Sequence, residues 1–317
     1  MANKFGAFVP FYAFKNQQPN ITSLFSRLQQ TVKECEQLGY QSAWLDDHLM
    51  INKTQTLECW TTLAALSNAT TKIRLGTMIT CNTFRNPSLL AKMAATVDGI
   101  SNGRLELGIG AGIQQNEHQA YGVAFPCPMI RIQQMDEALD VMKLLWTQET
   151  ASYSGKHYSL HNAICEPKPL QKPYPPITVG GAGEQLTLGV TAKHANRFDW
   201  GYLPSKKEYL HKLQVLTKHC NDVGRDVDEI EKSCWPFGQI FLGKNKNELN
   251  KLVPNWLPKG VELKEFMQTN FVGTPEDCIK QIQEYVDVGV TYFMLYFGDF
   301  PSLRGLKLFA QTVLPNF

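Results

Sequence analysis

The sequence lacks the features that mark membrane-spanning, secreted and nucleic-acid-binding chains. No stretch of its 317 residues approaches the roughly 18–20 apolar residues that cross a bilayer. Residues 1–5 carry neither a long apolar run nor a small-residue cleavage site, so we expect no secretory signal. The formal net charge is only +2, from 31 basic and 29 acidic residues. That balance gives no electrostatic reason to expect nucleic acid or a membrane as a partner.

Cysteine and metal-binding patterns are also missing. The eight cysteines are spread along the chain and form no C-x-x-C pair, which excludes the usual zinc spacing and argues against a disulfide framework. No H-E-x-x-H or other ligand spacing is found, so we expect no metal site. Scattered single thiols are typical of a reducing compartment, and we expect a cytoplasmic protein.

The sequence does contain a regular alternation of short apolar runs with longer amphipathic stretches. Hydrophobic residues make up 43% of the chain and charged residues 19%, as in ordinary globular proteins. The pattern predicts eight strands, each followed by a helix, at 5–10, 42–46, 72–80, 104–110, 176–181, 199–203, 233–242 and 290–297. Eight such units predict an α/β protein with one (β/α)8 TIM barrel domain over residues 1–317.

Two irregular stretches interrupt this alternation. Residues 147–176, after the fourth helix, are rich in proline and are either a domain boundary or a barrel insertion. A second stretch follows the seventh strand and runs to about residue 271. Because the barrel pattern resumes after each stretch, we predict two insertions within one domain.

In parallel barrels the chemistry lies where strands end and loops begin. Asp46, Asp47 and His48 directly follow the second predicted strand. Two carboxylates beside an imidazole suit acid–base work or ligand orientation, and we expect catalytic roles for Asp47 and His48. The alternative is that one aspartate caps the next helix and the histidine is an ordinary polar residue.

Polar and small residues follow the third and fourth predicted strands. Thr80 and Asn82 can reach the edge of a planar heterocycle, or they are ordinary polar residues at a strand end. Gly110 belongs to a glycine cluster at 108–112 where the backbone can approach a flat ligand closely. The spacing of this cluster does not match a dinucleotide fingerprint. Glu117 and His118, shortly afterwards, lie either over the same pocket or on a solvated loop.

A second glycine-rich turn follows the fifth predicted strand. It comprises Gly180, Gly181, Ala182 and Gly183 and leads directly into a predicted helix that starts at Glu184. Glycines before a helix N-terminus expose backbone N–H groups that bind phosphate. We therefore expect this turn to hold a phosphate.

Taken together and in order, these segments resemble the bacterial luciferase-like monooxygenase superfamily, which includes deazaflavin-dependent oxidoreductases. The resemblance runs over nearly the whole chain and rests on WLDDH at 44–48, the run from 75 to 98, SNGRLELGIGAG at 101–112, Glu117 to Gly122, GGAGEQLTL at 180–188 and GTPED at 273–277. It implies a flavin or deazaflavin ring at the barrel mouth near Asp47, His48, Thr80 and Asn82, and a phosphate on residues 180–183. It also implies a homodimer.

The resemblance is greatest to the branch that uses coenzyme F420. It implies hydride transfer between F420 and a small organic substrate, with His48 as ring contact or proton donor and Asp47 orienting it. The alternatives are an FMN-dependent monooxygenase that uses oxygen and a cofactor-binding barrel without turnover. One departure is Ile113, where many relatives have tryptophan. The catalytic glutamate of deazaflavin-dependent sugar-phosphate dehydrogenases has no match here, which argues against that activity.

Overall fold

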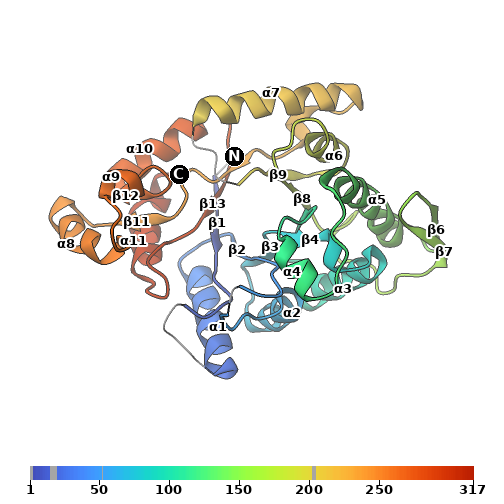
Figure 1. The fold of residues 1–317 in the computed structure, drawn as a ribbon, viewed down its shortest axis with the longest axis horizontal. Coiled ribbons are helices and arrows are strands. Elements are labelled where there is room, and N and C mark those ends of the chain that lie inside the picture. Colours follow the sequence, from blue (N-terminus) through green and yellow to red (C-terminus); the bar gives the residue numbers. More distant parts are fainter. Residues whose placement is uncertain (1–2, 15–19, 52, 202–204) are drawn as a thin grey trace.

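Eight parallel strands form a nearly closed barrel in the computed structural model, which describes residues 3–14, 20–51, 53–201 and 205–317. The strands run in the order β10–β13–β1–β2–β3–β5–β8–β9 and helices surround them (Figure 1). A bridge between Arg197 and Glu231 links β9 to the segment that leads into β10. The barrel strands are β1 (Lys4–Phe8), β2 (Ser42–Leu45), β3 (Arg74–Thr77), β5 (Leu105–Gly110), β8 (Ile177–Gly180), β9 (Arg197–Asp199), β10 (Ser233–Cys234) and β13 (Tyr292–Leu295).

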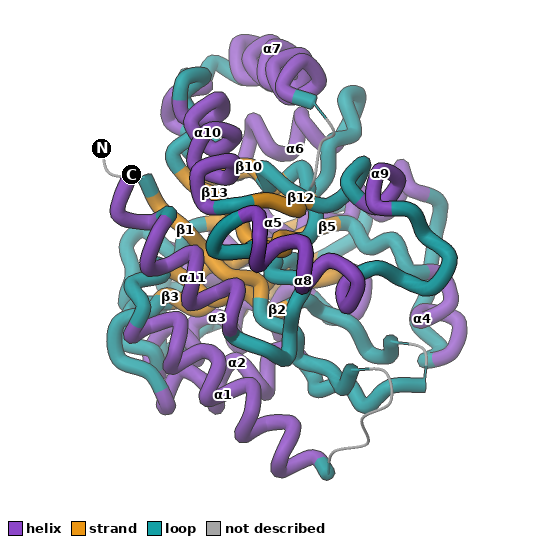
Figure 2. Tube along the Cα trace, turned by 90° about the vertical axis from the view of Figure 1, so that its left-hand side faces the viewer, coloured by secondary structure: helices purple, strands orange, loops and turns teal. Residues whose placement is uncertain are grey.

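Helices lie between the barrel strands along the chain, and most of them bury apolar residues. They are α1 (Ile21–Gln37), α2 (Cys59–Ala69), α3 (Pro87–Ile100), α4 (Gln115–Ala120), α5 (Pro128–Thr147), α6 (Thr187–His194), α7 (Lys206–Asp222), α8 (Lys246–Trp256), α9 (Leu263–Phe266), α10 (Pro275–Val286) and α11 (Arg304–Thr312). Viewed from the side, the strands lie inside this ring of helices (Figure 2). Among the described residues, no helix combines the length and apolar character needed to cross a membrane.

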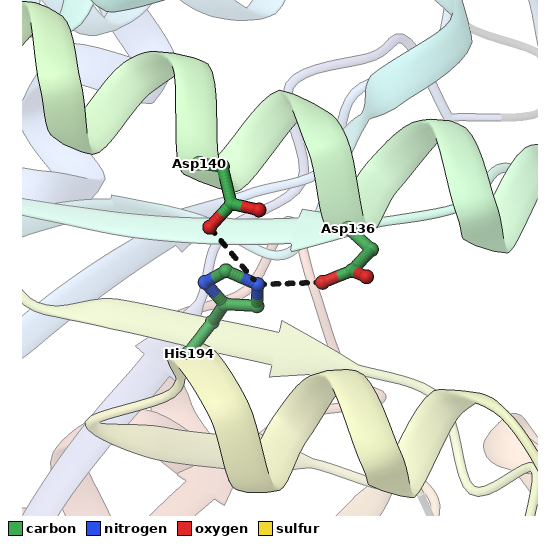
Figure 3. A group of neighbouring side chains, drawn as sticks. All are labelled: Asp136, Asp140 and His194. Carbon is green, nitrogen blue, oxygen red and sulfur yellow. Dashed lines mark hydrogen bonds and ion pairs between the residues drawn. The ribbon is translucent and has the colours of Figure 1, made fainter. Parts of the chain in front are cut away.

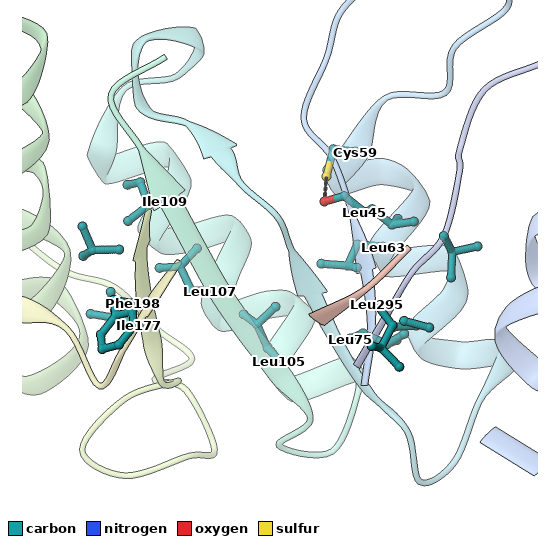
Figure 4. Close-up of a cluster of buried hydrophobic side chains, with 14 of the residues drawn as sticks. Leu45, Cys59, Leu63, Leu75, Leu105, Leu107, Ile109, Ile177, Phe198 and Leu295 are labelled. Carbon is teal, nitrogen blue, oxygen red and sulfur yellow. Dashed lines mark hydrogen bonds between the residues drawn. The ribbon is translucent and has the colours of Figure 1, made fainter. Parts of the chain in front are cut away.

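Strand β5 shows how the alternation of the sequence builds the two sides of the barrel wall. Leu105, Leu107 and Ile109 are fully buried in the main apolar core (Figure 4). The intervening Glu106 and Gly108 take the opposite face, because successive strand residues point to opposite sides. All six residues of β5 are buried, as expected for a strand covered on both faces.

Ion pairs fill the interior of the barrel towards the N-terminal ends of the strands. Arg197 is buried, and its guanidinium contacts Glu106 at 3.1 Å and Glu231 at 2.7 Å. The same guanidinium lies 3.8 Å from the centre of the Tyr292 ring. A hollow of about 720 Å³ at this end is lined by these paired groups. Since its main charges are already matched, we place the candidate site at the opposite end.

Two predicted strands are interrupted. The prediction for 72–80 divides into β3 and the short β4 (Thr80–Cys81), and the Met78–Ile79 peptide bond between them is cis. The prediction for 233–242 as one strand was wrong: β10 ends at Cys234, and β11 (Ile240–Leu242) pairs instead with β12 (Phe271–Gly273). Pro236 lies between β10 and β11, and proline cannot donate to a strand ladder.

The irregular stretches contain secondary structure outside the barrel. A hairpin of β6 (Ala151–Ser154) and β7 (Ser159–Ala163) lies between α5 and β8 and projects from the barrel (Figure 1). Helices α8 and α9 lie between β11 and β12. The sixth strand begins earlier than predicted, at Arg197, and residues 202 and 203 of that prediction lie outside the described residues.

Candidate active site

The C-terminal ends of β2, β4, β5, β8 and β9 surround a cavity of about 350 Å³. Most of the residues predicted to form the site line it. They are Asp47, His48, Thr80, Gly110, Gly180 and Gly181. Apolar side chains from Met78, Ile79, Phe84 and Trp200 also line the cavity. A mostly apolar pocket with a few fixed polar groups suits a flat organic ligand.

His48 is held between two carboxylates. Its Nδ1 lies 2.6 Å from Glu117 Oε1, and its Nε2 lies 3.0 Å from Asp46 Oδ2. Burial alone would lower the pKa of His48, but the hydrogen bonds and charges of Asp46 and Glu117 outweigh it and raise this pKa to about 9. The ring therefore carries a proton on both nitrogens at neutral pH.

The two carboxylates differ in their surroundings. Glu117 is 3% exposed, and its second oxygen accepts a hydrogen bond from the backbone N–H of Leu49 at 2.9 Å. Asp46 lines the cavity and its side chain is 31% exposed. The Nε2 proton of His48 is therefore on the side of the ring nearer the open cavity. Glu117 lies in α4, which covers this part of the barrel rather than forming a solvated loop.

The expected orienting role of Asp47 towards His48 was wrong. The Asp47 carboxylate accepts two hydrogen bonds from Arg85, at 2.5 and 2.9 Å, and one from the backbone N–H of Cys81 at 2.9 Å. Burial raises the pKa of Asp47, and the Arg85 guanidinium acts in the opposite direction. This fork of two parallel hydrogen bonds fixes Asp47 against the loop after β4, so Asp46 and Glu117 orient the imidazole instead.

Glycine residues make room for Ile79, which lines the cavity. A Cβ at Gly180 would lie 1.6 Å from Ile79 Cδ1, and a Cβ at Gly108 would lie 2.8 Å from Ile79 Cγ2. Gly181 has a φ of +109°, which side chains rarely adopt. The glycine at 180 is therefore needed for packing as well as for any contact with a ligand.

Thr80 and Asn82 differ in their relation to the cavity. Thr80 is fully buried and lines the cavity, and among the described residues its hydroxyl has no hydrogen-bond partner. An unpartnered buried hydroxyl fits a site that a polar ligand atom completes. Asn82 is also buried, in the short 3₁₀ helix Asn82–Phe84, but it does not line the cavity.

The second glycine turn is only partly in the cavity wall. Gly180 and Gly181 line the cavity, whereas Ala182 and Gly183 do not. The prediction that this turn leads directly into a helix was wrong, because α6 starts at Thr187 after an intervening turn. The Leu188 N–H donates to the carbonyl of Gly183 at 3.0 Å, which ties the turn to the first helical residues.

His118 supports the cavity wall next to Cys81. It is fully buried between the rings of Phe84 and Phe125, whose centres lie 4.7 and 4.5 Å away. Its Nε2 lies 2.6 Å from the Thr83 hydroxyl, and its Nδ1 lies 2.7 Å from a backbone carbonyl. Both ring nitrogens thus have partners within the protein, which favours a structural role.

Comparison with known proteins identifies the family to which this barrel belongs. The sequence profile of the luciferase-like monooxygenases matches residues 4–292. The chain belongs to the luciferase-like monooxygenase family.

Proteins similar to this luciferase-like chain in sequence or in fold have different cofactors in their names. The F420-dependent glucose-6-phosphate dehydrogenase of Microbacterium testaceum is 26% identical over 89% of this chain and 90% of its own. The coenzyme F420-dependent tetrahydromethanopterin reductase of Methanopyrus kandleri superposes with a TM-score of 0.81, at 19% identity and over 100% of both chains. The oxygenating constituent of a 3,6-diketocamphane monooxygenase of Pseudomonas putida, in complex with FMN, gives a TM-score of 0.78 at 17% identity, over 100% of this chain and 99% of its own.

The sequence analysis did not identify two residues of the candidate site. Arg85 was seen only as part of a family pattern, although it is the partner of Asp47. Asp199 was expected to begin a strand, but it ends β9 and lines the cavity. A charged residue within an otherwise apolar predicted strand was the available signal for Asp199, since such a residue fits the end of a barrel strand better than its interior.

Outside the cavity, one group among the described residues has side chains close enough to share a metal ion. Asp136 and Asp140 of α5 point towards His194 at the end of α6 (Figure 3). His194 Nε2 lies 2.6 Å from Asp136, and the Lys193 ammonium lies 3.1 Å from Asp136 and 2.8 Å from Asp140. Because the Lys193 ammonium pairs with both carboxylates and His194 with Asp136, the group fits an ion-pair network that joins the two helices.

Proposed function

We propose that the protein is an oxidoreductase that transfers hydride between coenzyme F420 and a small organic substrate. The observation that carries this proposal is the position of His48, fixed between Asp46 and Glu117 beside a mostly apolar cavity. Hydride transfer to a carbonyl carbon needs a proton for the carbonyl oxygen, and a positioned imidazolium supplies one. The F420-dependent relative, similar over 89% of the chain, supports the deazaflavin in particular.

The cavity walls fit a planar ring with a phosphate-bearing tail. Thr80 offers an unpartnered hydroxyl, and Gly110 lets the backbone come close to a ring. The turn of Gly180, Gly181, Ala182 and Gly183 would hold the phosphate through the N–H groups of Ala182 and Gly183, because the Gly181 N–H already donates to the Asp199 carbonyl. Asn82 would support Thr80 from outside the cavity. When bound, the deazaflavin supplies a ring carbon that accepts or releases a hydride.

His48 and Asp47 have different roles in this proposal. His48 gives its Nε2 proton to the substrate oxygen during reduction and takes it back during oxidation, while Glu117 holds Nδ1. Asp47, paired with Arg85 and bonded to the backbone N–H of Cys81, fixes β4, the short strand that carries Thr80, and therefore positions the cofactor wall. We propose this positioning role in place of a direct role in proton transfer.

The substrate is proposed to be a small molecule other than a sugar phosphate. Ile113 lines the cavity mouth and is 83% exposed, so an apolar side chain meets whatever enters there. The absence of the glutamate expected in sugar-phosphate dehydrogenases points in the same direction. We further propose a cytoplasmic homodimer, in keeping with the family resemblance and the scattered free cysteines.

The second candidate is an FMN-dependent monooxygenase. The FMN-bound structure from Pseudomonas putida has the same fold at a TM-score of 0.78 and supports this alternative. The two candidates differ in their need for oxygen, because a deazaflavin does not readily form the oxygen adduct on which flavin monooxygenases depend.

Turnover without oxygen tests the proposal. Purified protein is mixed with reduced F420 and a panel of small aldehydes and ketones under anaerobic conditions, and the return of oxidised-deazaflavin absorbance is followed. We expect oxidation of F420 by the wild type, and a loss of about 10²-fold or more in His48→Asn. Asp136→Asn, which alters a distant ion pair, is the control. Turnover only with reduced FMN and oxygen would favour the monooxygenase, and no turnover with either cofactor would favour a binding protein.

A further inference from the structure

The Asp199 carboxylate lies in the cavity wall, and the roles proposed above do not use it. It ends β9 and is 6% exposed. Its Oδ1 accepts two hydrogen bonds, from the Gly201 N–H at 2.8 Å and from the Trp235 indole N–H at 2.7 Å. Within the described part of the chain, no group donates to Oδ2 and no cation pairs with this carboxylate. One oxygen is therefore left for a ligand.

Burial and a nearby negative charge disfavour the ionised form of Asp199. Burial raises the pKa of Asp199, the N–H groups of Gly201 and Trp235 lower it, and the negative charge of Asp46 raises it further. His48, also in the cavity wall, has its charge matched by Asp46 and Glu117.

The other ionisable groups on the neighbouring elements do not balance the negative charge of an ionised Asp199. Arg197, two residues earlier on β9, is engaged by two glutamates. Burial raises the pKa of Cys234 on β10 and of Tyr209 on α7, so both are neutral. β8, the neighbouring strand on the other side, carries no ionisable side chain.

Asp199 lies directly beside the glycine turn proposed to hold a phosphate. Asp199 on β9 lies opposite Gly180 on the neighbouring strand β8, and the Gly181 N–H donates to the Asp199 backbone carbonyl at 2.8 Å. A phosphate on this turn would bring negative charge next to an unpaired, buried carboxylate. Like charges at short range in a poorly solvated site raise the pKa of the carboxylate further.

We propose that Asp199 takes up a proton when a phosphate-bearing cofactor binds and then donates a hydrogen bond to that cofactor from Oδ2. This inference rests on the proposed function, because it needs a phosphorylated cofactor in this cavity. The proton comes from solvent, and no other bond is made or broken. Asp199 thus links cofactor affinity to pH without a role in hydride transfer.

The linkage has a defined sign. Because the bound protein holds the proton more tightly than the free protein, affinity falls by up to about tenfold per pH unit between the two pKa values of Asp199. His48, whose pKa is about 9 in the protein without cofactor, is already protonated at neutral pH and has no further proton to take up.

Isothermal titration calorimetry of F420 and FMN measures this linkage directly. Each cofactor is titrated into the full-length protein at neutral pH in buffers with different ionisation enthalpies, which gives the number of protons taken up. The wild type is compared with Asp199→Asn, which keeps the size, the acceptor for Gly201 and Trp235 and a donor at the second position. Asp136→Asn is the matched control.

We expect an uptake approaching one proton in the wild type and in the control, and its loss in Asp199→Asn together with a flatter dependence of affinity on pH. Binding with equal proton uptake in Asp199→Asn and the wild type overturns the role of Asp199 and leaves the proposed function standing. Failure of both cofactors to bind overturns both. If the variant does not fold, infrared difference spectra of the wild type decide: a new carboxylic-acid carbonyl band on binding supports the proposal, and its absence overturns it.

Discussion

The charge on His48 depends on Glu117, and this dependence can be measured in the protein without any cofactor. Two carboxylates raise the pKa of His48 from 6.5 to about 9 against the opposing effect of burial. In Glu117→Gln the side chain keeps its size and an acceptor for Nδ1, but it loses its charge. If the two carboxylates contribute comparably, the pKa of His48 falls by about 1 unit or more, which corresponds to about 1.4 kcal/mol or more of differential interaction.

Nuclear magnetic resonance of the histidine ring protons provides the assay. The chain has seven histidines, so His48 is assigned by the signal that disappears in His48→Asn. Glu149→Gln, which changes an exposed glutamate, should leave the titration of His48 unaltered. A pKa for His48 in Glu117→Gln within about 0.3 units of the wild-type value would refute the claim that the buried carboxylate holds the imidazole protonated.

Three further predictions concern stability and are measured by urea unfolding. The raised pKa of His48 stabilises the fold by up to about 3 kcal/mol. This contribution is fully present below about pH 6.5 and is lost as the pH rises to about 9. The same loss of stability at alkaline pH in the wild type and in His48→Asn would contradict this prediction. Arg85→Met leaves Asp47 buried and unpaired and should cost about 3–5 kcal/mol, with recovery in the double variant that also carries Asp47→Asn. Gly180→Ala places a methyl group against the Ile79 side chain and should destabilise the fold by about 1–3 kcal/mol. Its control, Gly99→Ala, changes an exposed helical position with open space and should stabilise the fold by about 0.5–1 kcal/mol.

The barrel could be predicted because its signals are local. Alternating apolar strands, amphipathic helices and glycine or proline boundaries repeat along the chain, and β5 and α3 follow them closely. The two strand errors have different origins. The prediction for 233–242 passed over Pro236, which is a local signal because proline cannot donate to a strand ladder. The prediction for 72–80 is interrupted between β3 and β4, where Ile79 packs into space that Gly180, distant in the sequence, leaves open.

The sequence predicted where the candidate site lies better than it predicted which side chains of the site pair with one another. Strand-end residues such as His48 and Thr80 do line one cavity. The pairing of Asp47 with Arg85, and of His48 with Glu117, joins residues 38 and 69 positions apart, and no local pattern encodes such a choice of partner. Asp199 could be assigned to the site only by placing the end of the three-residue strand β9 correctly. Strand and helix ends are the least certain part of a prediction from sequence.

The central claim is that this cavity binds a deazaflavin, and equilibrium binding of F420 and FMN to the purified apo-protein, measured side by side, tests it most directly. The account predicts a clear preference for F420, with micromolar affinity, and weaker binding of both cofactors in Gly181→Val, which fills the glycine turn at a left-handed backbone position. A preference for FMN would contradict the proposed deazaflavin chemistry and would favour the oxygen-dependent monooxygenase.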